Sequence, residues 1–300
     1  MPEVCEITLT SQYLLQHLKN KSIRKINIVS GKYTHMDLKG RNLIDKPIQV
    51  IDVDNYGKFM WIILRGDEKF IYILNNFGLT GEWSFEKKKN VRISFEIDDD
   101  TTLYFYDDRN FGLLEITTER KTLDEKINKL APDILKTEFT NEEFNFWVSE
   151  YIKKSKKRGD NPIVKALLFQ DKKDGIVSGI GNYLASEILY RAKISPHTRV
   201  KDLSKDRLNV LAETIRKVSK HCYITNTTRY IKGFSQFIEE HKKQIKNGQV
   251  PNYHPEIEIN DDDIFAFQVY GRKIDKFDND VKTDTIAGTR TTYWVPSVQK

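Results

Sequence analysis

Cysteine is scarce in this sequence: two occur among the 300 residues, Cys5 and Cys222. So few cysteines exclude a disulfide framework and any zinc site made of four cysteines, and they suit a reducing compartment. No run of about 18 apolar residues occurs, so we expect no membrane span. The N-terminus, MPEVCEITLT, has two acids and no apolar signal stretch. Together these absences predict an intracellular protein.

Internal repeats and low-complexity tracts are also absent. The 39% hydrophobic and 31% charged residues exclude disorder, collagen and coiled coil as the dominant class, and the length fits two domains better than one. Residues 1–138 contain 21 Lys and Arg against 22 Asp and Glu, and residues 139–300 contain 28 against 21. A net charge of −1 followed by +7 indicates either that the second half binds a polyanion or that it has a lysine-rich solvated surface.

The first half is dominated by short segments rich in β-branched and aromatic residues, which predict a sandwich or a barrel. Turn signals at residues 65–68 and 98–100 predict two hairpins. Ile7, Leu14 and Leu18 lie at helical spacing and predict one helix before the strands. The predicted strands are residues 23–29, 49–56, 59–64, 70–74, 91–97 and 102–106.

The second half has helical patterns. Thr140 followed by Glu143 predicts a capping box at a helix start, and the basic stretch KKSKKRG at residues 153–159 predicts a surface loop. From about residue 260 the chain returns to β character, with Gly271 and Gly288 as turn residues. We place a domain boundary near residues 135–140. Further helices are predicted at residues 163–170, 183–192 and 203–223.

The first three residues suggest a chemistry. Met before a small residue is usually removed, which would leave Pro2 as the N-terminal residue with a free secondary amine. An α-amino group has a pKa near 7.7–8.0, against about 10.4 for lysine, so far more of it is unprotonated at neutral pH. Such an amine can attack the anomeric carbon of a sugar and expel a base, while the adjacent Glu3 moves protons. Because many proteins begin with Met-Pro, the motif needs support from elsewhere in the chain.

That support comes from further segments along the chain. With them, the start resembles the formamidopyrimidine-DNA glycosylase and endonuclease VIII family, which opens Met-Pro-Glu-x-Pro-Glu. Pro2, Glu3 and Glu6 match this opening, and Cys5 replaces its second proline. The resemblance implies that Pro2 is the nucleophile, that Glu3 assists proton transfer and that Glu6 supports the site.

The resemblance also implies a fold. It is an α+β fold with an N-terminal β-sandwich preceded by a helix, then a helix-two-turn-helix domain that ends in a β-hairpin finger. We place these domains at residues 1–138, 139–260 and 261–300.

Two loops of the first half resemble family segments that insert into the base stack of DNA. NFGLTG, from Asn76, is similar to the family's His-Leu-Gly-Met-Ser-Gly, from which Asn76 and Leu79 depart. DRNFG, which contains Arg109 and Phe111, resembles the segment that fills the hole left by an extruded base. The resemblance implies that Leu79, Arg109 and Phe111 fill this void.

Three residues from separate segments are implied to bind phosphate. Lys58 in NYGK looks like the family's hairpin lysine, and the resemblance implies that it contacts a phosphate and supports the catalytic chemistry. Asn182 lies in GIGNYLASE, which looks like the hairpin of the helix-two-turn-helix domain, although an ordinary glycine turn before a helix has the same pattern. A glycine-rich turn before a helix presents backbone N–H groups to anions. Arg290 corresponds to the finger arginine, whose guanidinium suits phosphate.

The end of the chain resembles the family's zinc finger without its cysteines. QVYGR at residues 268–272 opens the segment and RTTYWVPSVQ closes it, with Val295 and Val298 where a final cysteine pair would stand. This pattern is similar to the zincless-finger branch of some eukaryotic and giant-virus members. We therefore expect no structural zinc and no cofactor, and an apolar core of Trp294, Val295 and Val298 in place of the metal.

The resemblance implies a bifunctional DNA glycosylase and AP lyase in base excision repair, which acts through a Schiff base at Pro2 and β,δ-elimination. Its partner is damaged duplex DNA, with single-stranded DNA left open, and the protein is expected to be a monomer wherever DNA is maintained, in nucleus or cytoplasm. Oxidised pyrimidines and hydantoins are favoured over 8-oxoguanine. The alternatives are an inactive protein that binds damaged DNA on the same scaffold, and an RNA- or ribosome-binding relative of the helical domain.

Overall fold

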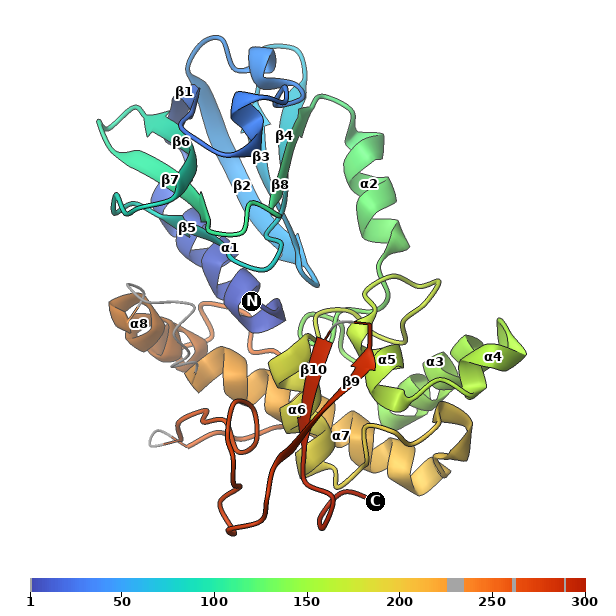
Figure 1. The fold of residues 1–300 in the computed structure, drawn as a ribbon. Coiled ribbons are helices and arrows are strands. Elements are labelled where there is room, and N and C mark those ends of the chain that lie inside the picture. The colour runs from blue at the N-terminus through green and yellow to red at the C-terminus, as the bar shows by residue number, and fades with distance from the viewer. Residues whose placement is uncertain (1, 226–234, 261–262, 289) are drawn as a thin grey trace. The chain divides into compact units, whose positions relative to one another are not determined.

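The computed structural model describes residues 2–225, 235–260, 263–288 and 290–300. The chain forms two compact units (Figure 1). The first contains Pro2 and residues 6–128, and the second contains residues 3–5 and 129–300. Within the described residues, none of the helices has the length and hydropathy needed to cross a membrane.

The first unit is an antiparallel β structure with one long helix. Its elements are α1 (Val4–Leu18), β1 (Ser22–Ile28), η1 (Lys32–Thr34), η2 (Arg41–Leu43), β2 (Ile48–Tyr56), β3 (Phe59–Arg65), β4 (Phe70–Asn76), β5 (Gly81–Ser84), β6 (Val91–Ile97), β7 (Thr102–Asp107), β8 (Leu113–Thr117) and α2 (Arg120–Lys129). The strands form an eight-stranded sheet in the order β5-β7-β6-β1-β2-β3-β4-β8.

The sheet opens between β1 and β2 into two four-stranded layers, as the sandwich prediction requires (Figure 1). The register of β1 with β2 comprises two residue pairs, whereas β3 and β4 pair along their whole length. Trp83 on β5 is fully buried in the core, with its ring 4.9 Å from that of Phe105 and its indole N–H donating to Oδ1 of Asn75 at 3.0 Å. Ile7 and Leu14 of α1 join the same core.

The six predicted strands and both hairpins are present, and the predicted helix begins a turn earlier, at Val4. Strands β5 and β8, the two edges of the sheet, were not predicted. They have four and five residues, which is too few for a clear apolar alternation. Helix α2 was not predicted either, and Leu123 is its one buried residue.

The second unit is mainly helical. Its elements are α3 (Asn141–Lys153), α4 (Lys156–Gly159), α5 (Ile163–Leu168), α6 (Asn182–Arg191), η3 (Val200–Asp202), α7 (Lys205–Thr225), α8 (Ser235–Lys246), β9 (Lys282–Ala287) and β10 (Arg290–Trp294). The three further predicted helices correspond to α5, α6 and α7. Helix α8 was missed, although Phe237, His241 and Ile245 are buried at a spacing of four residues.

Local signals set several of these boundaries. The capping box of α3 is confirmed: the Glu143 N–H donates to Oγ1 of Thr140 at 3.2 Å, and the Thr140 N–H donates to Oε2 of Glu143 at 2.7 Å. The prediction of a loop at residues 153–159 was wrong in part, because Lys156–Gly159 forms the short helix α4. The returning β character is confirmed by the β9–β10 hairpin, at whose turn Gly288 has a φ of 65°.

The division between the units falls after residue 128, earlier than the expected boundary at residue 138. The reason is backbone pairing inside the second unit. The Ala131 N–H donates to the carbonyl of Gln170 at 2.9 Å, and the Ser178 N–H donates to the carbonyl of Pro132 at 2.7 Å. The partition of residues 139–300 into two domains stays a prediction.

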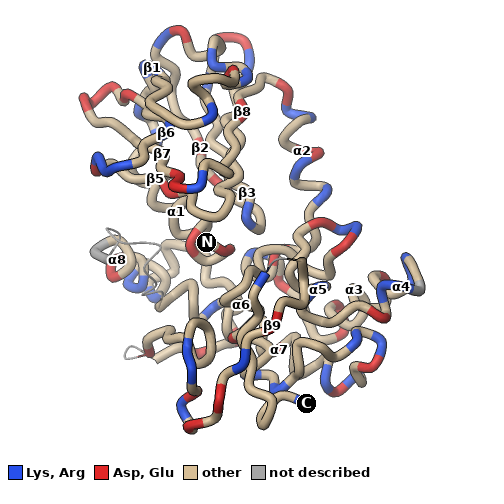
Figure 2. The backbone as a smooth tube through the Cα atoms, in the orientation of Figure 1, with Lys and Arg blue, Asp and Glu red and all other residues tan. Residues whose placement is uncertain are grey.

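Both units carry charged residues of both signs along their backbone. Lys and Arg are interleaved with Asp and Glu along both units in the tube view (Figure 2). The net positive charge of the second half therefore does not by itself locate a polyanion-binding surface, which has to be identified from individual residues.

Candidate active site

Pro2 lies two residues before the start of helix α1 at Val4 and is buried. Glu6 lies in the first turn of α1 and is 1% exposed. Two of the predicted catalytic residues, Pro2 and Glu6, therefore share the N-terminal end of this helix in the first unit.

Glu3 belongs to the second unit, where its carboxylate lies at the N-terminus of α6. Its Oε1 accepts the N–H of Tyr183 at 2.9 Å, and its Oε2 accepts those of Gly181 at 2.6 Å and Leu184 at 3.2 Å. The first N–H groups of a helix have no partner within the helix, and the helix dipole favours negative charge there. Because the N-cap is a glycine without a capping side chain, Glu3 supplies the cap and is itself fixed in position.

The turn before α6 is built to receive this segment. Gly179 has a φ of 105°, and a Cβ added there would lie 2.7 Å from Cβ of Val4. The Val4 N–H donates to the Gly179 carbonyl at 3.1 Å. Gln170 fixes the turn from the other side, because its Oε1 accepts the Gly179 N–H at 2.6 Å and its Nε2 donates to the Ile180 carbonyl at 2.8 Å. The glycine is therefore required by close packing.

Asn182 and Arg290 lie on elements that pack together in the second unit, since α6 contacts both α5 and β10. Asn182 is the first residue of α6, and its Oδ1 is buried with no hydrogen-bond partner among the described residues. Arg290 opens β10, and its Nη1 donates to the carbonyl of Leu168, the last residue of α5, at 3.1 Å. One contact leaves most of the five guanidinium donors available.

Lys58 lies in the tight turn between β2 and β3, beside Gly57 with its φ of 55°. The buried Asn55 holds this hairpin to α1. Its Nδ2 donates to Oγ1 of Thr8 at 3.0 Å, and its Oδ1 accepts the hydroxyl of Ser11 at 2.9 Å. Asn55 therefore links the lysine turn to the helix that follows Pro2.

The two predicted void-filling loops are joined in the first unit. The buried Asp107 accepts the hydroxyl of Thr80 with one carboxylate oxygen and the N–H of Gly112 with the other. The Arg109 N–H donates to the same Thr80 hydroxyl at 3.0 Å. The loops approach so closely that a Cβ at Gly78 would lie 2.8 Å from the Gly112 nitrogen.

Their side chains differ in exposure. Leu79 is half-buried, Arg109 is exposed, and Phe111 is 58% exposed although it is a large apolar residue. An ordered loop that presents an exposed phenylalanine suits insertion into a base stack.

Glu187 is the most informative residue that the sequence analysis left without a role. Its buried carboxylate accepts the N–H groups of Gln268, Val269 and Tyr270 at 2.9–3.0 Å, and Arg191 pairs with it at 3.3 Å. It thereby binds the start of the finger to α6. Asn55, Gln170 and Asp107 were missed in the same way, because sequence alone does not show which polar side chains are buried.

The finger packs around apolar side chains. Val295 and Val269 are fully buried with Tyr190, and Val298 packs against them. Placing Trp294 in this core was wrong: its indole N–H donates to Asp284 at 2.6 Å, and its ring meets that of His197. A valine at position 295 or 298 offers no ligand to a metal, so these side chains do not fit the family's zinc. Within the described residues, His, Cys, Asp and Glu form no group of three suited to a metal ion.

Comparison with known proteins agrees with this geometry. Models of the formamidopyrimidine-DNA glycosylase N-terminal, H2TH and C-terminal domains match residues 1–114, 130–247 and 255–300. A formamidopyrimidine-DNA glycosylase of Mycoplasma genitalium is 25% identical over 268 residues, which cover 84% of this chain and 89% of that protein.

Solved structures share the fold. MutM (Fpg) of Thermus thermophilus superposes with a TM-score of 0.72 at 21% identity and covers 99% of this chain and 98% of its own. A Lactococcus lactis enzyme bound to DNA with an AP site gives a TM-score of 0.74 at 16% identity and covers 99% of each chain. The fold is that of the glycosylases with an H2TH domain. By its three matching domains, the chain belongs to the formamidopyrimidine-DNA glycosylase family.

Proposed function

We propose that this chain is a DNA glycosylase with AP lyase activity, which excises damaged bases from duplex DNA in base excision repair. The single observation that carries the proposal is the fixed carboxylate of Glu3, held by three backbone N–H groups one residue after the candidate nucleophile Pro2. A protein that only bound DNA would have no need of this pairing of amine and acid. The family relationship and the DNA-bound relatives support the same assignment.

The proposed chemistry begins at the Pro2 nitrogen once Met1 has been removed. The secondary amine attacks C1′ of the damaged nucleotide, the glycosidic bond breaks, and the base leaves with the proton that the amine gives up. The C1′–O4′ bond then opens, O4′ takes up a proton, and an iminium forms between C1′ and the Pro2 nitrogen. Loss of a proton from C2′ then expels the 3′ phosphate, and a second elimination expels the 5′ phosphate. The strand is nicked and water releases Pro2.

Glu3 is the proton carrier in this scheme, and Glu6 supports the site from the first turn of α1. A general acid or base must be held within hydrogen-bond reach of its proton. The cap at α6 gives Glu3 a single position, which suits that task. Both carboxylates are buried.

Phosphate is the proposed ligand of Lys58, Asn182 and Arg290. The lysine is a point charge on a tight turn, the amide stands at a helix N-terminus, and the guanidinium has donors beyond its bond to Leu168. These groups recognise phosphate oxygens better than base edges. They are proposed to anchor the strand on either side of the extruded nucleotide.

Leu79, Arg109 and Phe111 are proposed to fill the space that the extruded base leaves. Thr80 and Asp107 support this assignment, because they fix the two loops that carry the three side chains. Unstacking a base costs a few kcal/mol, and inserted side chains offset part of that cost.

The finger is proposed to fold without zinc, as in the zincless branch that the sequence resembles. Packing of Val295 against Val269 and Tyr190 supports this assignment. Oxidised pyrimidines and hydantoins are the proposed preferred lesions, on the strength of that resemblance and of Leu79 in place of the family's methionine.

An incision assay tests the proposal. Duplexes of one sequence would carry 5-hydroxyuracil, a spiroiminodihydantoin, 8-oxoguanine or a preformed abasic site, and their strand products would be separated on denaturing gels. We expect nicking of the abasic duplex, and faster excision of the first two lesions than of 8-oxoguanine. Binding of the damaged duplexes without any nicking would favour the alternative, an inactive damage-binding protein.

A further inference from the structure

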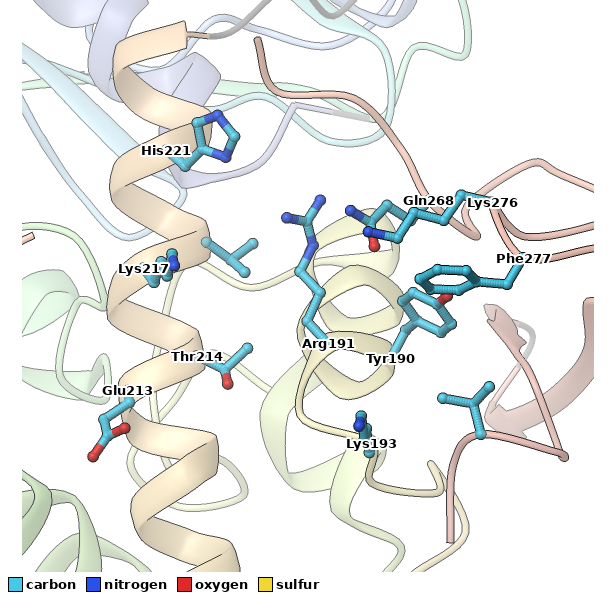
Figure 3. Close-up of a pocket in the computed structure, with 12 residues that line it drawn as sticks. Tyr190, Arg191, Lys193, Glu213, Thr214, Lys217, His221, Gln268, Lys276 and Phe277 are labelled. Atoms are coloured by element: carbon cyan, nitrogen blue, oxygen red, sulfur yellow. The ribbon is translucent and has the colours of Figure 1, made fainter. Parts of the chain in front are cut away.

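The second unit contains a pocket of about 450 Å³ between α6, α7 and the finger segment. It is formed at the C-terminal end of α6, whereas Glu3 and Asn182 lie at the N-terminal end of the same helix. Figure 3 shows Arg191 of α6 between His221 of α7 and Gln268 of the finger segment. None of the residues assigned to catalysis, phosphate binding or void filling lines this pocket.

The charged residues that line the pocket are mostly positive: Arg191, Lys193, Lys217 and Lys276, with one acid, Glu213. Arg191 is already paired with Glu187 at 3.3 Å, so three lysines remain against Glu213. The Glu213 carboxylate accepts a hydrogen bond from Nδ2 of Asn141 at 2.9 Å, outside the pocket. The excess of cations predicts an anionic ligand.

Two buried polar atoms in this pocket lack partners among the described residues: Nε of Arg191 and Nε2 of His221. Burial lowers the pKa of His221, and the charge of Arg191 lowers it further, which favours the neutral ring. A neutral imidazole donates from one nitrogen, and Arg191 donates from Nε. An oxygen-rich anion would satisfy both atoms at once, which buried polar groups normally require.

One wall of the pocket is a loop held in a fixed shape. The buried Asp275 accepts the hydroxyl of Tyr190 at 2.8 Å and the N–H groups of Phe277 and Asn279 at 2.8 Å and 2.9 Å. This loop presents Phe277, which is 66% exposed, and Lys276 at the pocket. A rigid loop that exposes an aromatic ring beside cations offers a flat stacking surface.

We propose that this pocket binds a nucleotide, with its phosphate at Arg191, His221 and Lys276 and its base stacked on Phe277. The volume lies within the range of about 300–1,000 Å³ that small-molecule sites occupy. A base stacks on an aromatic ring whatever its identity, while the phosphate gives the charge match. The ligand is either a free nucleotide or the end of a single strand, since both have the same phosphate and base. The site is separate from the proposed active site and does not depend on it.

Isothermal titration with deoxyadenosine monophosphate tests this proposal, with deoxyadenosine and inorganic phosphate as partial ligands. We expect the nucleotide to bind more tightly than either part. Phe277→Ala and Lys276→Ala should each weaken it by about tenfold, as expected for the loss of one stacked ring or one ionic contact. Phe146→Ala and Lys205→Ala are matched controls, since Phe146 and Lys205 are exposed on α3 and α7, and should leave the affinity unchanged.

A short single-stranded oligodeoxyadenylate distinguishes the two sources. Tighter binding of the oligonucleotide than of the mononucleotide, weakened by Phe277→Ala, assigns the site to strand ends, and equal or weaker binding assigns it to free nucleotides. Equal affinities in the pocket variants and their controls, or no heat at millimolar nucleotide, would overturn the proposal and leave water as the partner of Arg191 and His221. Phe277→Ala should nick an abasic duplex like the unchanged protein, so failure here is separable from failure of the glycosylase assignment.

Discussion

The carboxylate of Glu3 accepts the backbone N–H of Tyr183, with 2.9 Å between Oε1 and N. Residues 180 positions apart are thus joined at the start of α6, and the adjacent bond from Val4 to Gly179 fixes the backbone as well as the side chain. An unsatisfied buried N–H costs about 1–3 kcal/mol, so the acid also stabilises the fold. Glu3 therefore has a structural role in addition to the chemical role proposed for it.

Glu3→Gln is expected to separate these roles. The amide keeps one acceptor oxygen for α6 but loses the charge and turns an NH₂ group toward backbone donors. We expect loss of base excision by about 100-fold or more, the scale of general acid–base catalysis, with nicking of a preformed abasic site largely retained. Rates on lesion and abasic duplexes measure both. Glu142→Gln, an exposed acid in the first turn of α3, is the control. Equal loss of both activities would count against the assigned role.

Arg290→Ala tests the phosphate contact. Loss of one phosphate contact should weaken binding alike for different DNA sequences and reduce the slope of log K against log salt by about one. Titration of an abasic duplex at several salt concentrations gives this slope. Arg199, which is exposed and pairs with Asp202, provides a control in Arg199→Ala. An unchanged slope would leave Arg290 with only its bond to Leu168.

The fold could be predicted from the sequence at positions where a short local motif determines the backbone structure. Thr140 and Glu143 specify a capping box by themselves, and Gly288 marks a hairpin turn. The resemblance identified Pro2 and Glu3, but no local pattern shows that Glu3 caps a helix 180 residues away. Glu187 was missed for the same reason, because its partners are backbone N–H groups about 80 residues further along the chain. Asp107 was missed because its partners, the Thr80 hydroxyl and the Gly112 N–H, lie in two irregular loops.

The finger is expected to contain no zinc, so treatment with a metal chelator should not change the stability or activity of the protein. Elemental analysis of purified protein is expected to show far less than one zinc per chain, and chelators should leave the thermal midpoint and abasic nicking unchanged. Val295→Ala should instead destabilise the protein by about 2 kcal/mol, because it removes buried methyl groups and leaves a cavity. Val210→Ala, on the exposed face of α7, should have little effect. A stoichiometric zinc would contradict this account of the finger.

The lowered pKa of Asp275 predicts that the stability of the folded protein depends on pH. Burial raises the pKa of this carboxyl, but hydrogen bonds from Asn279, Tyr190 and Phe277 outweigh it and lower the pKa to about 2 from an ordinary 3.8. Because the folded pKa is depressed, the carboxylate stabilises the folded state above about pH 4, and this contribution is lost as the pH falls toward 2. Denaturant titrations should show Asp275→Asn less stable than the unchanged protein near neutral pH, with the difference shrinking through that window. A constant difference would refute the linkage.

Borohydride trapping tests the central claim, that the Pro2 nitrogen attacks the damaged nucleotide, most directly. Reduction of the iminium during reaction with a labelled lesion duplex should give a covalent protein–DNA band, and mass spectrometry of the digested adduct should place the DNA on the N-terminal peptide. Protein whose N-terminus is blocked, by retained Met1 or by chemical acylation confirmed by intact mass, should give no band. A band of undiminished intensity from blocked protein, with the adduct on an internal lysine such as Lys58, would contradict the account.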